Sequence, residues 1–105
     1  MEIILMVKQI IIWKLQDKCF GPNLESIKSN IKHKFEELSG RIDGLSDIEV
    51  HSNCMSSSNG DVALIATFDS EEAQKQCRND EDWNAVMKDA VVPFIQDTNH
   101  VEFSL

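Results

Sequence analysis

The hydrophobic pattern of the first part of the chain predicts a strand that is covered on both of its faces. From Ile3 to Leu15, apolar side chains occupy both sets of alternating positions. One set holds Ile10 and Ile12, and the other holds Ile11 and Trp13. Successive side chains of a strand point to opposite faces, so both faces here carry apolar bulk. The chain's own helices can cover one face, but the second face needs a different partner.

A helix is predicted after a turn at Gly21-Pro22. Apolar residues then recur every three or four positions, the spacing that forms one stripe along a helix; they are Leu24, Ile27, Ile31, Phe35 and Leu38. We expect Asn23 to cap the first turn of this helix, and Gly40 to end it in the left-handed conformation.

Two strands separated by a loop are predicted next. Residues 48–54 alternate between polar and less polar side chains, which is typical of a half-buried strand. Residues 56–60 form the loop, which ends in the reversal signal Asn59-Gly60. Residues 61–68 are apolar at both alternating sets of positions, so this strand is also predicted to be covered twice.

Two short helices and a final strand complete the predicted order. A helix begins after Ser70 and runs to about Arg78, and Asn79-Asp80 indicates a break with a new cap. A second apolar stripe spans residues 83–90, and Pro93 limits its continuation. Residues 99–105 form the last strand, with Glu102 facing away from its apolar side chains.

This order of elements predicts an α+β, ferredoxin-like fold. Strand, helix, strand, strand, helix, strand is the βαββαβ arrangement, in which a four-stranded antiparallel sheet carries its helices on one face. With 105 residues, we expect residues 1–105 to form a single domain.

The face of the sheet away from the helices is predicted to be a homodimer interface. It carries six apolar side chains if the alternation holds, namely Ile10, Ile12, Ala63, Ile65, Val101 and Phe103. At roughly 25 cal/mol per Å² of apolar surface, leaving them in water would forgo several kcal/mol. A patch of this size on a small protein indicates an interface, and a two-fold pairing of sheet against sheet would cover it.

Composition and charge indicate which partners to exclude and in which cell compartment to expect the protein. The apolar fraction is 42%, the charged fraction is 27%, and the formal net charge is -8. An acidic surface repels phosphate, so we expect neither a nucleic acid nor a membrane as partner. Cys19, Cys54 and Cys77 are widely separated, which favours reduced thiols and a cytoplasmic protein. No apolar run reaches the length of a secretory signal or a membrane span.

Few residues suggest metal or nucleophilic chemistry. No pair among His33, His51 and His100 has the spacing of metal ligands, so we expect no metal and no cofactor. The run Ser56 to Ser58 lacks the setting of a nucleophilic serine. Cys77, next to Arg78, is either a thiol of lowered pKa or a half-buried structural thiol, and the second interpretation is favoured.

A pocket between the helices and the sheet is the better candidate site. Gln9 and Trp13 face the helices if the alternation holds, and Glu102 does so on the last strand. In a ferredoxin-like sheet the first and last strands are neighbours, so Gln9 and Glu102 can orient a small ligand together, with Trp83 above them. The alternative is that Trp13 and Trp83 fill the core and that Gln9 simply binds Glu102.

Several segments resemble the stress-responsive A/B barrel family of the dimeric α+β barrel superfamily. They are Met6-Val7-Lys8 with residues 10–15, Ile42-Asp43-Gly44-Leu45 before Ile48-Glu49-Val50, residues 61–65 with 68–73, and Val92-Pro93-Phe94-Ile95. They occur in the family's order over nearly the whole chain. The resemblance implies a ferredoxin-like chain whose sheet pairs with that of a second copy to form a dimeric α+β barrel.

The departures from the family concern the residues that would carry chemistry. Family members often have His where this chain has Gln9, and His-Pro where it has Asp80-Glu81. A polyketide cyclase of the family uses a Tyr and a His at positions that match Cys77 and Trp83, which cannot replace them. The resemblance also places His51 where members tend to have a small residue, from which it would reach the mouth of the cavity.

The sequence therefore predicts a homodimeric A/B barrel protein of uncharacterised activity that binds a small hydrophobic or aromatic ligand, with Gln9, Trp13, His51, Trp83 and Glu102 as the tentative cavity residues. The alternative is a small cofactor-free enzyme of the cyclase, isomerase or monooxygenase type. Other branches of the superfamily carry out such chemistry in the same cavity.

Overall fold

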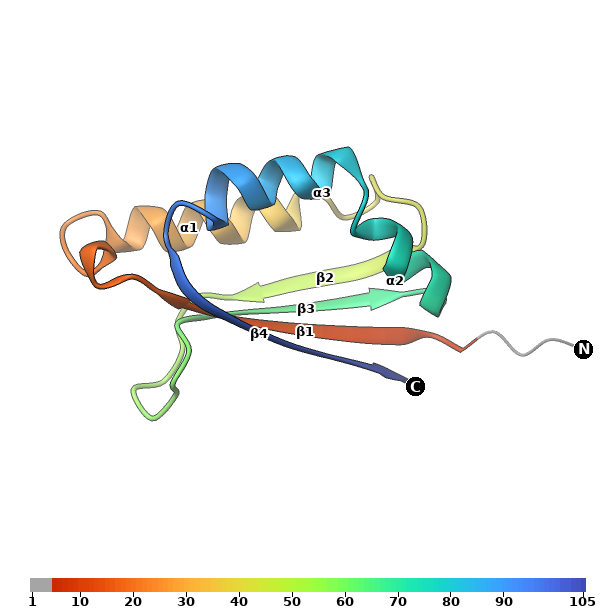
Figure 1. The fold of residues 1–105 in the computed structure, drawn as a ribbon, viewed down its shortest axis with the longest axis horizontal. Coiled ribbons are helices and arrows are strands. Elements are labelled where there is room, and N and C mark those ends of the chain that lie inside the picture. Colours follow the sequence, from red (N-terminus) through yellow and green to blue (C-terminus); the bar gives the residue numbers. More distant parts are fainter. Residues whose placement is uncertain (1–4) are drawn as a thin grey trace, which may run out of the picture.

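All helices of the computed structural model lie on one face of its sheet (Figure 1). The structure describes residues 5–105, so the first residues of the strand predicted from Ile3 lie outside the described part. The elements are β1 (Val7–Leu15), η1 (Asp17–Cys19), α1 (Leu24–Glu36), β2 (Leu45–His51), β3 (Val62–Phe68), α2 (Glu71–Cys77), α3 (Glu81–Val86), the π-helical turn η2 (Met87–Val91) and β4 (Ile95–Ser104).

The four strands have the order β2-β3-β1-β4, and every neighbouring pair is antiparallel. Ile10 of β1 lies opposite Ile65 on one side and Val101 on the other. The first and last strands are neighbours, with Gln9 opposite Glu102. The predicted ferredoxin-like α+β architecture is confirmed.

The bounds of β2 and β4 differ from the prediction, and β2 ends at His51 rather than at residue 54. β2 begins at Leu45, because Gly44 takes a φ of 83° and turns the chain directly into the sheet. β4 begins at Ile95 rather than near residue 99, because its pairing with β1 extends through a bulge to Leu15. The polar sequence of residues 96–100 hid this extension, since an edge strand tolerates polar side chains on both faces.

The helix caps agree with the prediction at two of three sites. The Ser70 hydroxyl accepts a hydrogen bond from the Ala73 N–H at 3.1 Å, and the Asp80 carboxylate accepts from the Trp83 N–H at 3.0 Å. The prediction for Asn23 is wrong, because its side chain makes no cap hydrogen bond. Its backbone carbonyl instead accepts from the Ile27 N–H, as part of the first helical turn.

The core lies between the sheet and the helices and contains a cluster of three aromatic rings. Trp13 of β1 stacks on Phe35 of α1 with ring centroids 5.4 Å apart. Phe35 also meets Trp83 of α3 edge to face at 5.1 Å. Trp13 and Phe35 have no exposed surface. These contacts fix α1 and α3 to the central strand of the sheet, and aromatic pairs of this geometry stabilise a core beyond their buried area.

The opposite face of the sheet is uncovered in the described chain and carries an apolar patch. The side chains predicted for this face share it, as the strand register requires; they are Ile10, Ile12, Ala63, Ile65, Val101 and Phe103. Val101 is 51% exposed, Phe103 42% and Ile12 39%. The loop between β2 and β3 projects from the sheet on this same side (Figure 1). We call these six residues the open-face cluster.

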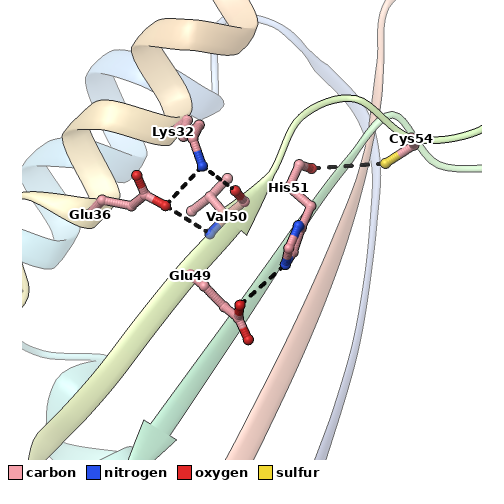
Figure 2. A network of polar contacts seen from close by, with 6 residues as sticks. All are labelled: Lys32, Glu36, Glu49, Val50, His51 and Cys54. Atoms are coloured by element: carbon pink, nitrogen blue, oxygen red, sulfur yellow. Dashed lines mark hydrogen bonds and ion pairs between the residues drawn. The ribbon is translucent and has the colours of Figure 1, made fainter.

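Side chains of α1 satisfy the free edge of β2 (Figure 2). Lys32 Nζ donates to the Val50 carbonyl at 2.8 Å and to Glu36 Oε2 at 3.0 Å. The same Glu36 oxygen accepts from the Val50 N–H at 3.3 Å. Burial alone raises the pKa of Glu36, but the hydrogen bonds from Lys32 and Val50 outweigh it, so its pKa is lowered.

We expect the Glu36→Gln variant to be less stable at pH 7 by about 0.5–1 kcal/mol, because these contacts are partly screened by water. A lowered carboxyl pKa contributes stability above the ordinary value of 4.5 and loses it as the pH falls through the folded-state pKa. The difference from wild type should therefore shrink in acid. Urea unfolding across this pH range measures it, with Glu37→Gln as the exposed control. A difference that does not vary with pH would contradict the assignment.

Candidate functional site

A pocket of about 190 Å³ lies between the helices and the β1–β4 half of the sheet. A cavity of about 150 Å³ holds a benzene ring, so this pocket has room for a ring-sized molecule. Its lining combines apolar and polar side chains from β1, β4, α2, α3 and η2; they are Gln9, Ile11, Trp13, Gln74, Cys77, Arg78, Trp83, Met87, Thr98, His100 and Glu102.

The register of β1 and β4 positions the sheet side of the pocket. Gln9 lies opposite Glu102, Ile11 opposite His100, and Trp13 opposite Thr98. These are alternate residues on both strands, so their side chains share the face that carries the helices. The structure thus brings together four of the five residues that the sequence suggested as a cavity lining, Gln9, Trp13, Trp83 and Glu102.

The polar side chains of the pocket lining are arranged around Glu102. Its Oε1 accepts from Gln9 Nε2 at 2.9 Å, and its two oxygens lie 2.9 and 3.0 Å from His100 Nδ1. Arg78 Nη2 approaches Oε1 at 3.5 Å. Burial raises the pKa of Glu102, but the hydrogen bonds from His100 and Gln9 and the nearby positive charges outweigh it, so the pKa is lowered. The carboxylate is therefore ionised at neutral pH.

The ionised carboxylate determines which nitrogen of His100 carries the hydrogen. A carboxylate can only accept hydrogen bonds, so Nδ1 of His100 must be the donor. In the neutral imidazole, Nε2 then has the free lone pair. The side chain of His100 is 56% exposed, whereas that of Glu102 is 23% exposed, so the histidine lies at the mouth of the pocket and the carboxylate behind it.

Two donors in the pocket lining lack a partner in the part of the chain that the structure describes. They are Trp13 Nε1 and Gln74 Nε2. Trp13 is 0% exposed and Gln74 is 4% exposed, so both groups are removed from solvent. A buried donor without an acceptor costs about 1–3 kcal/mol, and most buried donors are paired. Both groups belong to side chains that line the pocket, and a ligand acceptor would satisfy them if their neighbours shift to admit it.

The prediction that His51 reaches this cavity is wrong. His51 is exposed on β2, where its Nε2 lies 3.3 Å from Glu49 Oε2, and both side chains point away from α1 (Figure 2). Its neighbour Val50 is buried beneath the helices, so the alternation of the strand turns His51 to the other face. β2 is also separated from β1 and β4 by β3 in the sheet order.

Sequence reasoning missed His100, Gln74 and Arg78. A signal for His100 exists, because it lies two residues before Glu102 and must share its face of β4. Gln74 lies on α2 and Arg78 is its C-cap, and this helix is too short for its sequence to indicate which side faces the sheet. Their place in the lining depends on how α2 packs.

Cys77 is a buried structural thiol. It is 3% exposed, and burial together with the neighbouring Asp80 raises its pKa to about 12. The alternative of a thiol activated by Arg78 is therefore contradicted.

Two other kinds of feature are absent from the described residues. Residues 5–105 contain no helix of sufficient length and hydropathy to cross a membrane. No three side chains among His, Cys, Asp and Glu of these residues gather in a way that could hold a metal ion.

Comparison with known families shows which family the chain belongs to. Residues 7–105 match the stress responsive A/B barrel domain. The protein belongs to this family. No curated protein matches the sequence.

Several solved structures have the same fold as this A/B barrel protein. A dimeric protein of unknown function with a ferredoxin-like fold from Bacteroides fragilis is 23% identical, with a TM-score of 0.87 over 95% of this chain and 96% of that chain. An A/B barrel family protein from Mesorhizobium loti is 15% identical, with a TM-score of 0.71 over 94% and 95%. A proposed antibiotic biosynthesis monooxygenase from Nitrosomonas europaea is 11% identical, with a TM-score of 0.73 over 100% and 94%. At these identities the similarity shows the fold alone.

We expect Cys77 of this A/B barrel protein to resist alkylation in the folded state. At pH 8 a thiol with a pKa of about 12 has almost no thiolate, and burial blocks the reagent. Iodoacetamide labelling followed by peptide mass spectrometry should modify Cys77 only after unfolding in urea. Rapid labelling of Cys77 in the native protein would contradict its structural role.

Proposed function

We propose that this protein is a homodimer whose subunits each bind a small, ring-sized ligand with a hydrogen-bond acceptor in the pocket between the helices and the sheet. The observation that carries the ligand proposal is the pair of buried, unpartnered donors, Trp13 Nε1 and Gln74 Nε2, in the lining of one pocket.

The lining also favours a class of ligand. Ile11, Trp13, Trp83 and Met87 offer apolar and aromatic contacts, which suit a ring. The ionised Glu102 disfavours an anionic compound, although Arg78 partly offsets its charge. A neutral aromatic carbonyl compound combines a ring with an acceptor and avoids this repulsion.

The homodimer proposal rests on the open-face cluster. Six apolar side chains on one uncovered face are more than a small monomer usually leaves in water. For a valine, isoleucine or phenylalanine among them, full burial is worth about 1.5–3 kcal/mol. Structures of the same fold from Bacteroides fragilis and Thermobifida fusca are described as dimeric. Pairing of two open faces would give the dimeric α+β barrel that the family resemblance implies.

A second candidate function is a small cofactor-free enzyme acting in the same pocket. The pairing of His100 with an ionised Glu102 at the pocket mouth favours it, because this arrangement leaves an imidazole nitrogen free to accept a proton. A neighbour of the same fold from Nitrosomonas europaea is named as a proposed antibiotic biosynthesis monooxygenase.

We expect the Val101→Glu variant to weaken dimerisation by at least about a hundredfold, or roughly 3 kcal/mol, because each copy would place a charge in an apolar interface. Light scattering and sedimentation at micromolar concentration measure the mass. Val92→Glu is the matched control, since Val92 is 58% exposed and lies outside the open face. A wild-type protein that is monomeric at this concentration would overturn the dimer proposal.

We expect the pocket to bind phenylacetone more tightly than propylbenzene, which has a similar shape but no carbonyl. One additional hydrogen bond of about 1 kcal/mol corresponds to roughly a fivefold preference. In titration calorimetry, Trp13→Phe should reduce this preference because it removes the unpartnered donor.

Trp83→Phe is the matched control for that titration, because it makes the same change of ring in the same pocket without removing either unpartnered donor. It should retain the preference for phenylacetone. Equal affinity of the wild-type protein for both compounds would overturn the acceptor-binding site, and so would no detectable binding at millimolar concentration.

A further inference from the structure

We propose that the side chain of Arg78 is a gate between the pocket described above, the first pocket, and a second pocket beside α2. The ligand is then a neutral aryl ketone with a chain that passes this gate and carries a hydrogen-bond acceptor. This inference rests on the ligand site proposed above and extends it. Two observations carry it: the two pockets share one wall of side chains, and that wall contains a buried amide without an acceptor.

The second pocket has a volume of about 380 Å³ and lies between α2 and one end of the β1–β4 pair. Val7 and Ser104, which are opposite each other in the sheet, belong to its sheet side. Its helix side consists of residues 71, 74, 75 and 78. These residues follow one another at the spacing that places side chains on one face of a helix. The second pocket is therefore a groove along one face of α2.

Three residues line both pockets, and we call them the shared wall; they are Gln74, Arg78 and Glu102. Within this wall Arg78 Nη2 approaches Glu102 Oε1 at 3.5 Å, which is long for a charged hydrogen bond. The side chain of Arg78 is 60% exposed, and ion pairs of this kind contribute little free energy because water screens them. Separating the pair therefore costs little.

The contacts around Arg78 confine this opening to its side chain. Its carbonyl accepts from Asn84 Nδ2 at 3.0 Å, and its N–H donates to a carbonyl in the last turn of α2 at 3.3 Å. Glu102 keeps its contacts with Gln9 and His100 when the guanidinium group leaves. The guanidinium group can therefore rotate toward solvent without moving α2 or the carboxylate.

The shared wall lacks one hydrogen-bond acceptor. Gln74 is 4% exposed, and its Nε2 has no partner in the described chain. Gln74 lies one helical turn before Arg78, so rotation of the Arg78 side chain opens the wall next to it. A buried amide without an acceptor is costly, and an oxygen in a ligand chain that crosses the wall can supply the acceptor.

The charges of the second pocket favour an uncharged chain. Glu71 pairs with Lys75 at 3.3 Å, and Glu102 pairs with Arg78, so each carboxylate in the lining already has a cation beside it. A charged chain would meet a like charge as well as an opposite one. An ether oxygen accepts hydrogen bonds without this repulsion.

The first pocket determines which end of the ligand reaches the gate. Its volume of about 190 Å³ is filled by a ring with a short chain, so a longer chain has to leave it. Trp13 and Trp83 offer the ring its aromatic contacts, whereas Arg78 belongs to the polar side chains around Glu102. A ring bound among the tryptophans therefore directs the carbonyl side of the ligand toward the gate.

Intrinsic fluorescence of the full-length protein can follow binding, because Trp13 and Trp83 are the only tryptophans of the chain and both line the first pocket. We expect 1-phenyl-5-methoxypentan-2-one to bind at least about tenfold more tightly than phenylacetone, since each buried methylene is worth roughly fourfold. It should also bind at least as tightly as 1-phenylheptan-2-one, which has the same length but no ether oxygen. Weaker binding of the ether than of the all-carbon chain would overturn the assignment of an acceptor.

The Ser104→Trp variant tests whether the chain lies in the second pocket. Ser104 lines the second pocket but not the first, so a tryptophan there should block the chain and not the ring. We expect the methoxy ketone to lose its tenfold advantage, while the affinity for phenylacetone changes by less than about twofold. Ser39→Trp, at an exposed position that lines neither pocket, is the matched control. A methoxy ketone that keeps its advantage in Ser104→Trp would overturn the inference.

The Arg78→Ala variant tests the gate itself. Stopped-flow fluorescence should show association of the methoxy ketone accelerated by about two- to fivefold, the range that the loss of a weak ion pair allows. Association of phenylacetone, which does not cross the shared wall, should be unchanged. Arg41→Ala, at an exposed arginine outside both linings, is the matched control. An unchanged rate for the methoxy ketone in Arg78→Ala would show that Arg78 is not a gate.

The outcomes separate this inference from the proposed function. If phenylacetone binds and the methoxy ketone binds no more tightly, the second pocket takes no part and the ligand site of the first pocket stands. If neither compound binds, the proposed function is wrong, and the inference that rests on it is wrong as well.

Discussion

The apolar character of both faces of β1 is the constraint on which the rest of this structure depends. β1 pairs with β3 on one side and β4 on the other, so it is an inner strand of the sheet. On its helix-facing side Trp13 joins the aromatic cluster with Phe35 and Trp83, which ties α1 and α3 to the sheet. On the other side Ile10 and Ile12 belong to the open-face cluster. The helices can satisfy only one of these faces, so the proposed homodimer follows from the strand that also supports the pocket.

The pocket forms where the helical layer changes direction. Asp80 caps α3 immediately after α2 ends, so the two short helices meet above β1 and β4 rather than forming one continuous helix. At this junction the lining of the pocket changes from the aromatic cluster to the polar side chains around Glu102. The carboxylate is partly buried, yet it stays ionised because Gln9, His100 and Arg78 surround it. An apolar interior beside a fixed charge is a suitable environment for both ligand binding and proton transfer.

Particular residues show what could be predicted and what could not. The contact between Gln9 and Glu102 follows from the alternation of two strands that the fold makes neighbours, and the structure has it. His51 was misplaced because its position was inferred from the family resemblance, whereas the alternation of β2 turns it away from the helices. Gln74 was missed, since seven residues of helix carry too weak a pattern to indicate a buried polar side chain.

The sequence by itself determined the order of the elements, the side of each strand that its residues occupy, and the excess of apolar surface on the open face. These properties depend on a local repeat of two or of about 3.6 residues, which can be recognised within a short segment. Only the tertiary structure decided where the hollow lies, that Trp13 Nε1 and Gln74 Nε2 have no partner, and that His100 and Glu102 meet there. These properties depend on how helices distant in sequence pack on the sheet, and no periodic pattern in the chain specifies that packing.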